Sequence, residues 1–283
     1  MKKEIKLVKK VKRLLRLLGC PRWLHHYGPK TYEFLEHLCA LLMRAFGRLS
    51  YVRVVQLFDL LGIKCPRKSA LQETAAKLDA NFWQRVLKVT SGQAYLIGID
   101  STCLSRSNPS YHYLKRIDGK MPKVPIKMSV SFDTWKKKYC AAKIRVLPAH
   151  DVRDARYLLL HSNPKIATAD KGYRSEKLNK FAYEQDILLM IPMKSNVRNP
   201  GFFTKKMDKR FKIRTYHRRE LVESGNSSFK RKYGSCVSSR KARTIRTEVY
   251  GRLACHNLFY WLHRLSGWSP SIQKAYKPLR VML

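Results

Sequence analysis

The chain has 283 residues and a formal net charge of +40, from 59 Lys and Arg against 19 Asp and Glu. A hydrophobic content of 45% excludes a globally disordered chain, and no apolar run reaches the roughly 18 residues of a transmembrane helix. Self-repulsion at this charge opposes a compact state, so nucleic acid is the expected partner. On charge alone, a ribosome-like or histone-like binder without catalytic chemistry is as open as an enzyme.

The seven cysteines are scattered and form no C-x-x-C pair, which argues against a zinc ribbon or finger. Such an odd set predicts reduced thiols in a cytosolic protein. The N-terminus, "MKKEIKLVKKVKRLLRLLGC", starts basic like a signal peptide, but charges interrupt every apolar stretch. It therefore predicts a basic amphipathic helix.

Residues 1–92 have helical periodicity, with helices expected over 31–46, 50–63 and 69–87. Ser50 is a plausible N-cap, and Ser69 with Gln72 has capping-box spacing. Two helices joined by a short turn suggest a helix-turn-helix, although a plain helical bundle fits the pattern equally well. The region holds 19 Lys or Arg against 6 acids, which favours DNA contact.

From residue 93 the pattern changes to strands over 94–100, 124–133 and 139–149, a helix over 150–162, a strand over 165–170, a helix over 175–186 and a strand over 187–193. Residues 194–215 are expected to be a loop or insertion, and helices are expected over 216–234 and 244–265. This order predicts a mixed α/β layer with helices on its faces. The predicted domains are a helical DNA-binding region (1–92), an α/β domain (93–265) and a C-terminal tail (266–283).

Two aspartates, Asp100 and Asp170, each end an apolar strand. If the two strands are neighbours, the carboxylates lie side by side and repel unless a cation sits between them. Mg²⁺ suits this position because it takes oxygen ligands and pairs with phosphates. The alternative is that each aspartate is only a cap or turn residue.

A third acid, Glu223, lies in a basic helical segment. At about 100° per residue, Tyr216, Arg219, Glu223 and Lys230 share one narrow face. Three apolar residues lie on the other side and are expected to pack: Leu221, Val222 and Phe229. Glu223 would complete a site of two metal ions about 4 Å apart that activate a water or 3′-hydroxyl, with Arg219 and Lys230 holding phosphates. The alternative is a solvated charge paired with Arg219.

The segment also fits the spacing Tyr, two residues, Arg, three residues, Glu, six residues, Lys without a gap. This spacing resembles the signature of one branch of the DDE transposases of bacterial and archaeal insertion sequences. "GIDST" around Asp100 and "ADKGY" around Asp170 are similar to the contexts of the first and second Asp of that family. The resemblance covers about residues 50 to 260.

The resemblance implies an RNase H-like mixed-sheet domain, metal-dependent cleavage at insertion-sequence ends, and transfer of the 3′ hydroxyl into target DNA. Asp100, Asp170 and Glu223 would be the catalytic metal ligands for two Mg²⁺ ions, which Mn²⁺ can replace. Supporting and DNA-binding roles would fall to three residues: Tyr216, Arg219 and Lys230. It also implies binding to terminal inverted repeats and to target DNA, as a homodimer in a synaptic complex. The expected location is the nucleoid-associated cytoplasm of a prokaryotic host, not a membrane.

Two features depart from the family pattern. Cys103 stands where relatives often have Gly and is expected to crowd the loop after Asp100. The insertion before the Glu223 helix is only about 20 residues long, so a DNA-hairpin mechanism is not carried over. Two other functions stay open: an RNase H-like structure-specific nuclease that hydrolyses without joining, and a non-catalytic basic DNA-binding protein derived from a transposase.

Overall fold

The computed structural model describes residues 6–25, 27, 30–106, 115–116, 124–193 and 199–259. The predicted tail, 266–283, lies outside the described residues, as do the end of the last predicted helix (260–265) and residues 194–198 of the predicted insertion. Within the described part of the chain, no helix has both the length and the apolar character needed to cross a membrane. None of the seven cysteines, all of which lie within the described residues, forms a disulfide bond.

The N-terminal region is helical as predicted, with α1 (Lys6–Leu17), α2 (Phe34–Gly47), α3 (Tyr51–Leu60), α4 (Lys68–Lys77) and α5 (Ala80–Ser91). Ser50 caps α3 by accepting a hydrogen bond from the Arg53 backbone N–H. The prediction of one helix over 69–87 was wrong, because Asp79 caps a new helix by accepting from the Phe82 N–H at 2.7 Å. The capping box predicted at Ser69 is also absent, since α4 already begins one residue earlier.

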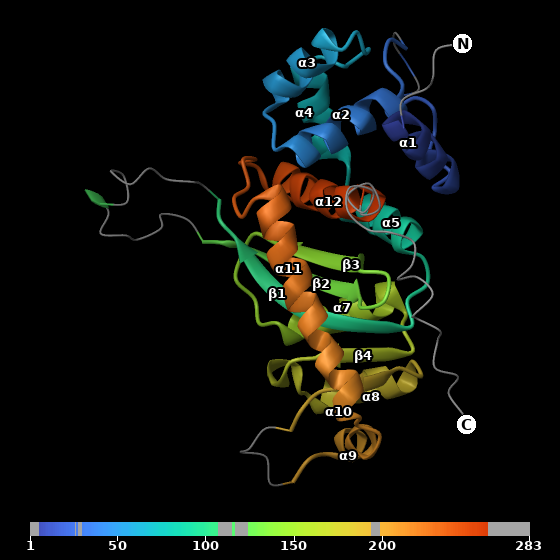
Figure 1. The fold of residues 1–283 in the computed structure, drawn as a ribbon, viewed down its shortest axis with the longest axis vertical. Helices are drawn as coiled ribbons and strands as arrows, with labels where there is room; N and C mark the ends of the chain where they lie inside the picture. The colour runs from blue at the N-terminus through green and yellow to red at the C-terminus, as the bar shows by residue number, and fades with distance from the viewer. Residues whose placement is uncertain are drawn as a thin grey trace, which may run out of the picture.

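The centre of the molecule is a five-stranded mixed sheet in the order β3-β2-β1-β4-β5 (Figure 1). The strands are β1 (Leu96–Leu104), β2 (Ile126–Asp133), β3 (Lys138–Arg145), β4 (Ile166–Ala169) and β5 (Leu188–Met190). Strands β1, β2 and β3 pair antiparallel, whereas β4 pairs parallel to both β1 and β5. The α/β class and the RNase H-like mixed sheet are therefore confirmed.

Helices cover both faces of the sheet, because strand side chains point alternately to either side. On one face, α5, α11 (Glu220–Tyr233) and α12 (Ala242–Phe259) pack on a core that includes Met128, Val130 and Phe229. On the other face, α7 (Val152–Ser162) and α8 (Glu176–Glu184) pack on a core that includes Ile97 and Ile99. Because α1, α2 and α5 share the first core, the N-terminal helices are packed into the α/β layer.

The loop predicted over 194–215 was wrong in part. Three short elements lie within and just after it: α9 (Phe202–Lys209), α10 (Ile213–Tyr216) and the 3₁₀ turn η2 (His217–Arg219). Helix α9 is capped from a distance, because Glu176 accepts from the Phe203 N–H at 2.9 Å and the Thr204 N–H at 3.1 Å. A cap supplied by a residue so far away in sequence leaves no local pattern.

Side chains cover the outer edge of β3. The Gln84 amide donates to the Cys140 carbonyl and accepts from the Ala142 N–H, both at 3.1 Å. The Asn257 amide accepts from the Tyr139 N–H at 2.9 Å and donates to its carbonyl at 2.8 Å. These two side chains, from α5 and α12, take the hydrogen bonds that a sixth strand would otherwise make.

Candidate functional site: an acidic group beside α11

The two aspartates lie on neighbouring strands, which is the arrangement that a shared metal site needs. The parallel register pairs Ile99 of β1 with Ala169 of β4, so Asp100 and Asp170 occupy the next positions along adjacent strands. Asp170 directly follows β4, whereas the prediction that a strand ends at Asp100 was wrong. Strand β1 continues to Leu104 because it pairs with β2 over that length. Cys103 therefore lies in a strand with its side chain exposed, and it does not crowd a loop.

Helix α11 lies directly on this part of the sheet. A Cβ atom added at Gly98 would come within 2.1 Å of Val222 Cγ2, and one added at Gly225 would come within 3.0 Å of the Phe132 ring. Glycine at both positions therefore lets the helix approach the strands closely. Val222 and Phe229 are fully buried, as the helical pattern predicted, and Leu221 is half-buried. The residue after Val222 is Glu223, so this close contact determines where that carboxylate lies.

Asp100 contacts α11 through Asn226, whose Nδ2 donates to Asp100 Oδ2 at 2.9 Å. Burial raises the pKa of the Asp100 carboxyl, and the negative charge of Glu223 raises it further. Hydrogen bonds from the Ser101 backbone and Asn226, with the positive charge of Arg219, oppose this rise. Asp100 therefore lies within electrostatic reach of both Arg219 and Glu223.

Arg219 lies among the acids. Its guanidinium Nη2 is 2.9 Å from Glu223 Oε1 in an i,i+4 ion pair. Burial alone would lower the pKa of Arg219, but the nearby charges of Tyr216, Glu223 and Asp170 raise it above its ordinary value. The positive charge of Arg219 therefore lies near Asp170, at the end of a strand, and near Glu223 on the helix. The ion pair named as the simpler alternative for Glu223 is present.

Tyr216 and Lys230 lie at either side of this group along the chain. The guanidinium of Arg219 is 6.0 Å from the centre of the Tyr216 ring, and Phe211 packs against that ring at 5.4 Å. Lys230 is seven residues beyond Glu223 on α11, about two helical turns, and is half-buried. The predicted single helix over 216–234 is divided, because α11 begins only at Glu220 after the 3₁₀ turn.

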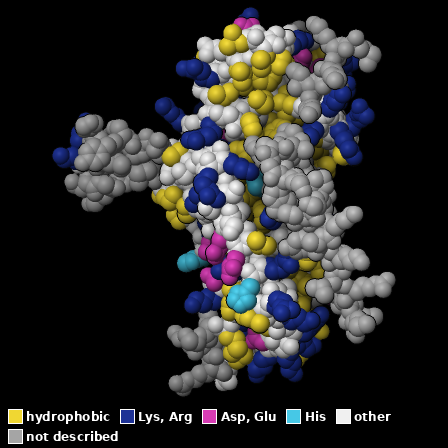
Figure 2. Space-filling view, in the orientation of Figure 1, with side chains coloured by type: hydrophobic (Ala, Val, Ile, Leu, Met, Phe, Trp, Pro, Cys, Tyr) yellow, Lys and Arg dark blue, Asp and Glu magenta, His cyan; other side chains and the backbone are white. Residues whose placement is uncertain are grey.

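Acidic side chains are few on the face of the molecule drawn in Figure 2. The largest group of Asp and Glu on that face lies beside α11, with Lys, Arg and His side chains around it. In a chain with 59 basic and 19 acidic residues, such a group is a local reversal of the overall charge. It is therefore a natural place for a cation.

The oxygen chemistry of this group fits a divalent metal ion such as Mg²⁺, which prefers carboxylate and amide oxygens. Asn226 Oδ1 is buried and has no hydrogen-bond partner in the part of the chain that the structure describes, so it adds an oxygen to those of Asp100, Asp170 and Glu223. Within the same described residues, no three His, Cys, Asp or Glu side chains already form a group that could hold a metal ion. Glu223 is instead paired with Arg219. With 54% of its side chain exposed, Glu223 has room to turn.

The residues that follow the two aspartates are joined by a buried polar chain. The Tyr173 hydroxyl lies 2.8 Å from Ser101 Oγ, which lies 3.0 Å from Ser129 Oγ. Ser129 donates to Asp154 Oδ2 at 2.9 Å, and Arg145 Nε donates to Asp154 Oδ1 at 2.7 Å. This chain connects β1 with the turn after β4 and so holds the backbone around both aspartates. Sequence reasoning assigned no role to these residues.

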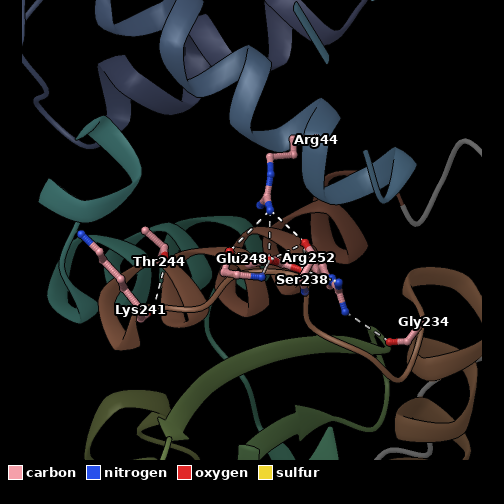
Figure 3. Close-up of polar contacts among 8 residues, drawn as sticks. Arg44, Gly234, Ser238, Lys241, Thr244, Glu248 and Arg252 are labelled. Atoms are coloured by element: carbon pink, nitrogen blue, oxygen red, sulfur yellow. Dashed lines mark hydrogen bonds and ion pairs between the residues drawn. The ribbon is translucent and has the colours of Figure 1, made fainter. Parts of the chain in front are cut away.

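Glu248 is a buried acid with a structural position (Figure 3). Its carboxylate lies 3.1 Å from Arg44 Nη2 of α2 and 2.5 Å from Arg252 Nη2 of α12. It also accepts from the backbone N–H of Ser238 at 3.1 Å and of Ser239 at 2.9 Å. Burial alone would raise the pKa of Glu248, but Arg44 and Arg252 outweigh it and hold the pKa below its ordinary value. The network joins the N-terminal helices to the segment after α11.

A mixed sheet in this strand order, with helices on both faces and acids gathered at adjacent strands, defines an RNase H-like α/β domain. Residues 91–258 match the family model described as "Transposase DDE domain". That match covers more than half of the chain, and the chain belongs to this family of DNA transposases. The predicted resemblance to the DDE transposases is thereby confirmed.

Two solved structures are similar at low identity. One is the piggyBac transposase synaptic complex with hairpin DNA, at 14% identity, a TM-score of 0.44, and coverage of 96% of this chain and 74% of that chain. The other is the Mos1 transposase paired-end complex with the left transposon end, at 10% identity, a TM-score of 0.24, and coverage of 92% and 87%. Both TM-scores are too low to add to the assignment. A search of the curated proteins finds no match.

Proposed function

We propose that this transposase cuts DNA at the ends of an insertion sequence and joins the freed 3′ hydroxyl to target DNA. The observation that carries the proposal is the parallel register of β1 and β4, with Asp100 and Asp170 on adjacent strands beneath α11. In this proposal, Asp100, Asp170 and Glu223 are the catalytic carboxylates. They hold two Mg²⁺ ions, for which Mn²⁺ can substitute.

Bound metal ions would supply Lewis-acid activation of a water or 3′ hydroxyl and neutralise charge at the phosphodiester. The protein's own contribution is positional. Asn226 orients Asp100 through the amide bond to Oδ2, and the close contact of Gly98 with Val222 fixes the height of Glu223 above the sheet. Arg219, released from Glu223, would bind a phosphate beside the scissile bond, Lys230 would bind a second phosphate, and Tyr216 would pack on a sugar or base.

The partners we propose are double-stranded DNA of the terminal inverted repeats and of the target, bound by a homodimer in a synaptic complex. We also propose that the helical region 1–92 contacts DNA through a helix-turn-helix. Residues 93–265 would form the catalytic domain, and residues 266–283 a C-terminal tail. The protein would act at the nucleoid in the cytoplasm of a prokaryotic host. The support for DNA as the partner is the family membership together with the net charge of +40.

The test replaces each proposed metal ligand with its amide and compares these variants with a control substitution on α11. Glu223→Gln removes the proposed ligand, and Glu220→Gln removes a more exposed acid three residues earlier whose partner is His217 at 3.6 Å. With Mg²⁺ and DNA carrying the element ends, we expect Glu223→Gln, Asp100→Asn and Asp170→Asn to lose cleavage and joining while still binding DNA. Glu220→Gln should keep both activities. Wild-type cleavage by Glu223→Gln would remove this residue from the site.

The same assay separates the other functions. Cleavage without any joined product would identify a structure-specific nuclease with this fold. DNA binding without cleavage, in the presence of either Mg²⁺ or Mn²⁺, would identify a non-catalytic binding protein. Joined products from the wild-type chain support the transposase.

A further inference from the structure

A basic site lies away from the acidic group, at the edge of the sheet formed by β3. An open cavity of about 670 Å³ is lined by the connection between α4 and α5, the end of β3 and the first turns of α12. Figure 1 shows α5 and α12 side by side next to β3. Five cations line it: Lys77, Lys143, Arg145, Arg243 and Arg246.

Most of this positive charge is not compensated by acids. Lys77 pairs with Glu73 at 2.7 Å, and Arg145 pairs with Asp154. Lys143 lies over the Tyr157 ring at 4.2 Å and has no carboxylate partner within the described residues. Arg243 and Arg246 likewise have no ion pair or hydrogen bond among those residues.

One acid, Asp79, lines the cavity, but its carboxylate accepts from the N-terminus of α5. Cations held together in this way repel one another until an anion joins them. The cavity is therefore suited to a ligand with several negative charges.

The remaining lining offers little for reading bases. It consists of backbone and small or aliphatic side chains, with Tyr250 as the one aromatic residue. The Tyr250 hydroxyl already donates to the Ala142 carbonyl at 2.7 Å. The lining holds no Asn, Gln, Ser or Thr, the side chains that read bases other than guanine most readily. Lys and Arg bind phosphates without regard to sequence, and guanine is the one base with which they commonly pair.

The cavity does not belong to the acidic group. Strand β3 is separated from β1 by β2, which places its backbone about 10 Å from that of β1. Lys143, at the cavity, is connected through Ser129 of β2 to Ser101 of β1, so two strand spacings separate the cavity from the strand that carries Asp100. The cavity lining also shares no residue with the acidic group.

We infer that this basic cavity binds the sugar-phosphate backbone of duplex DNA at a distance from the scissile bond, without reading its sequence. Arg243 and Arg246 are its principal anion ligands, because within the described residues they have no acid partner and, unlike Lys143, no aromatic ring beneath them. The inference rests on the proposed function, since it takes DNA as the partner. It adds a second, sequence-independent contact that would hold target or flanking DNA while the acidic group acts elsewhere.

The test is a double substitution, Arg243→Gln with Arg246→Gln, compared with Lys209→Gln with Arg210→Gln at the end of α9. Both pairs remove two charges, and Lys209 and Arg210 are exposed. Binding of a duplex of arbitrary sequence is measured by fluorescence anisotropy in EDTA over a range of salt concentrations. Two phosphate contacts contribute about 1.8 to the slope of log K against log salt, and each lost contact lowers affinity up to about eightfold at 0.1 M salt. We expect the smaller salt slope and the weaker binding only in the double variant of Arg243 and Arg246.

The outcomes separate the inference from the function. If the wild-type chain binds no DNA at all, the proposed function fails. If it binds and cleaves DNA but the two pairs show the same slope, the cavity is not a DNA site. A loss confined to duplexes carrying element ends would mean base reading, and a loss confined to an RNA competitor would mean a different ligand; either result overturns the inference. Equal unfolding temperatures of both pairs exclude misfolding as the cause.

Discussion

At the scale of single residues, the acidic side chains differ in how deeply they are buried and in how many partners they have. Asp154 and Glu248 are almost completely buried and are fully engaged with arginines and hydroxyls. Glu223 is half-exposed and held by one arginine. This difference distinguishes the structural carboxylates of Asp154 and Glu248 from the carboxylate of Glu223.

The first prediction concerns Asp154. Asp154→Asn removes a charge that pairs with Arg145 and accepts from Ser129, and we expect it to lower the free energy of unfolding by about 2 to 3 kcal/mol. Asp186→Asn is the matched control, because Asp186 pairs with Lys165 on the surface and asparagine tolerates its positive φ of 52°. That control should cost less than about 1 kcal/mol. Urea unfolding measures both, and equal losses would show that burial of Asp154 carries no special stabilisation.

At the scale of elements, the contact between α11 and β1 governs the site. Gly98 and Gly225 leave the space in which the helix lies on the sheet. Because Val222 and Glu223 are consecutive, any lift of the helix moves the carboxylate away from the two aspartates. The geometry of the acids therefore depends on residues that have no chemistry of their own.

The second prediction tests this dependence with Gly98→Ala. The added methyl collides with Val222 Cγ2, so we expect a cleavage rate roughly 100-fold lower, as for a displacement of about 1 Å, with DNA binding retained. The double variant with Val222→Ala removes the collision and should recover much of the rate. Gly172→Ala, where no atom lies within 4 Å, is the control. A normal rate in Gly98→Ala would mean that α11 adjusts without moving Glu223.

Element types followed from local patterns, but their ends and the site's supporting residues did not. The pairing of Asp100 with Asp170 was predictable because both follow apolar strand residues and parallel strands share an edge. The break at Asp79 and the cap that Glu176 gives to α9 depend on contacts outside the helices they define. Asn226 could be suspected only from its position three residues after Glu223, because its role depends on how α11 lies against Asp100.

At the scale of the whole molecule, the N-terminal helices and the α/β layer share one core and one buried ionic network. Arg44 of α2 reaches Glu248 of α12, which also binds the segment that follows α11. The helical region is thereby anchored next to the helix that carries Glu223.

The third prediction is a pH dependence. The pKa of Glu248 is held below its ordinary value of 4.5 by Arg44 and Arg252, so the unfolded chain binds more protons than the folded one in acid. The contribution of Glu248 to the free energy of unfolding is therefore fully present above about pH 4.5. It is lost as the pH falls through the lower pKa that Glu248 has in the folded state. We expect Glu248→Gln to cost about 3 kcal/mol at neutral pH and progressively less in acid. A difference that stays constant with pH, measured by urea unfolding against Glu220→Gln, would contradict this assignment.

The amides of Gln84 and Asn257 on β3 have a consequence for self-association. A bare outer strand recruits strands from other molecules, and at high protein concentration this leads to aggregation. Here side chains from α5 and α12 occupy that edge, so a second copy of the chain cannot add a strand to the sheet through β3. The protection lasts only while α5 stays docked, which makes the short helix from Ala80 to Ser91 a safeguard of solubility for the whole chain.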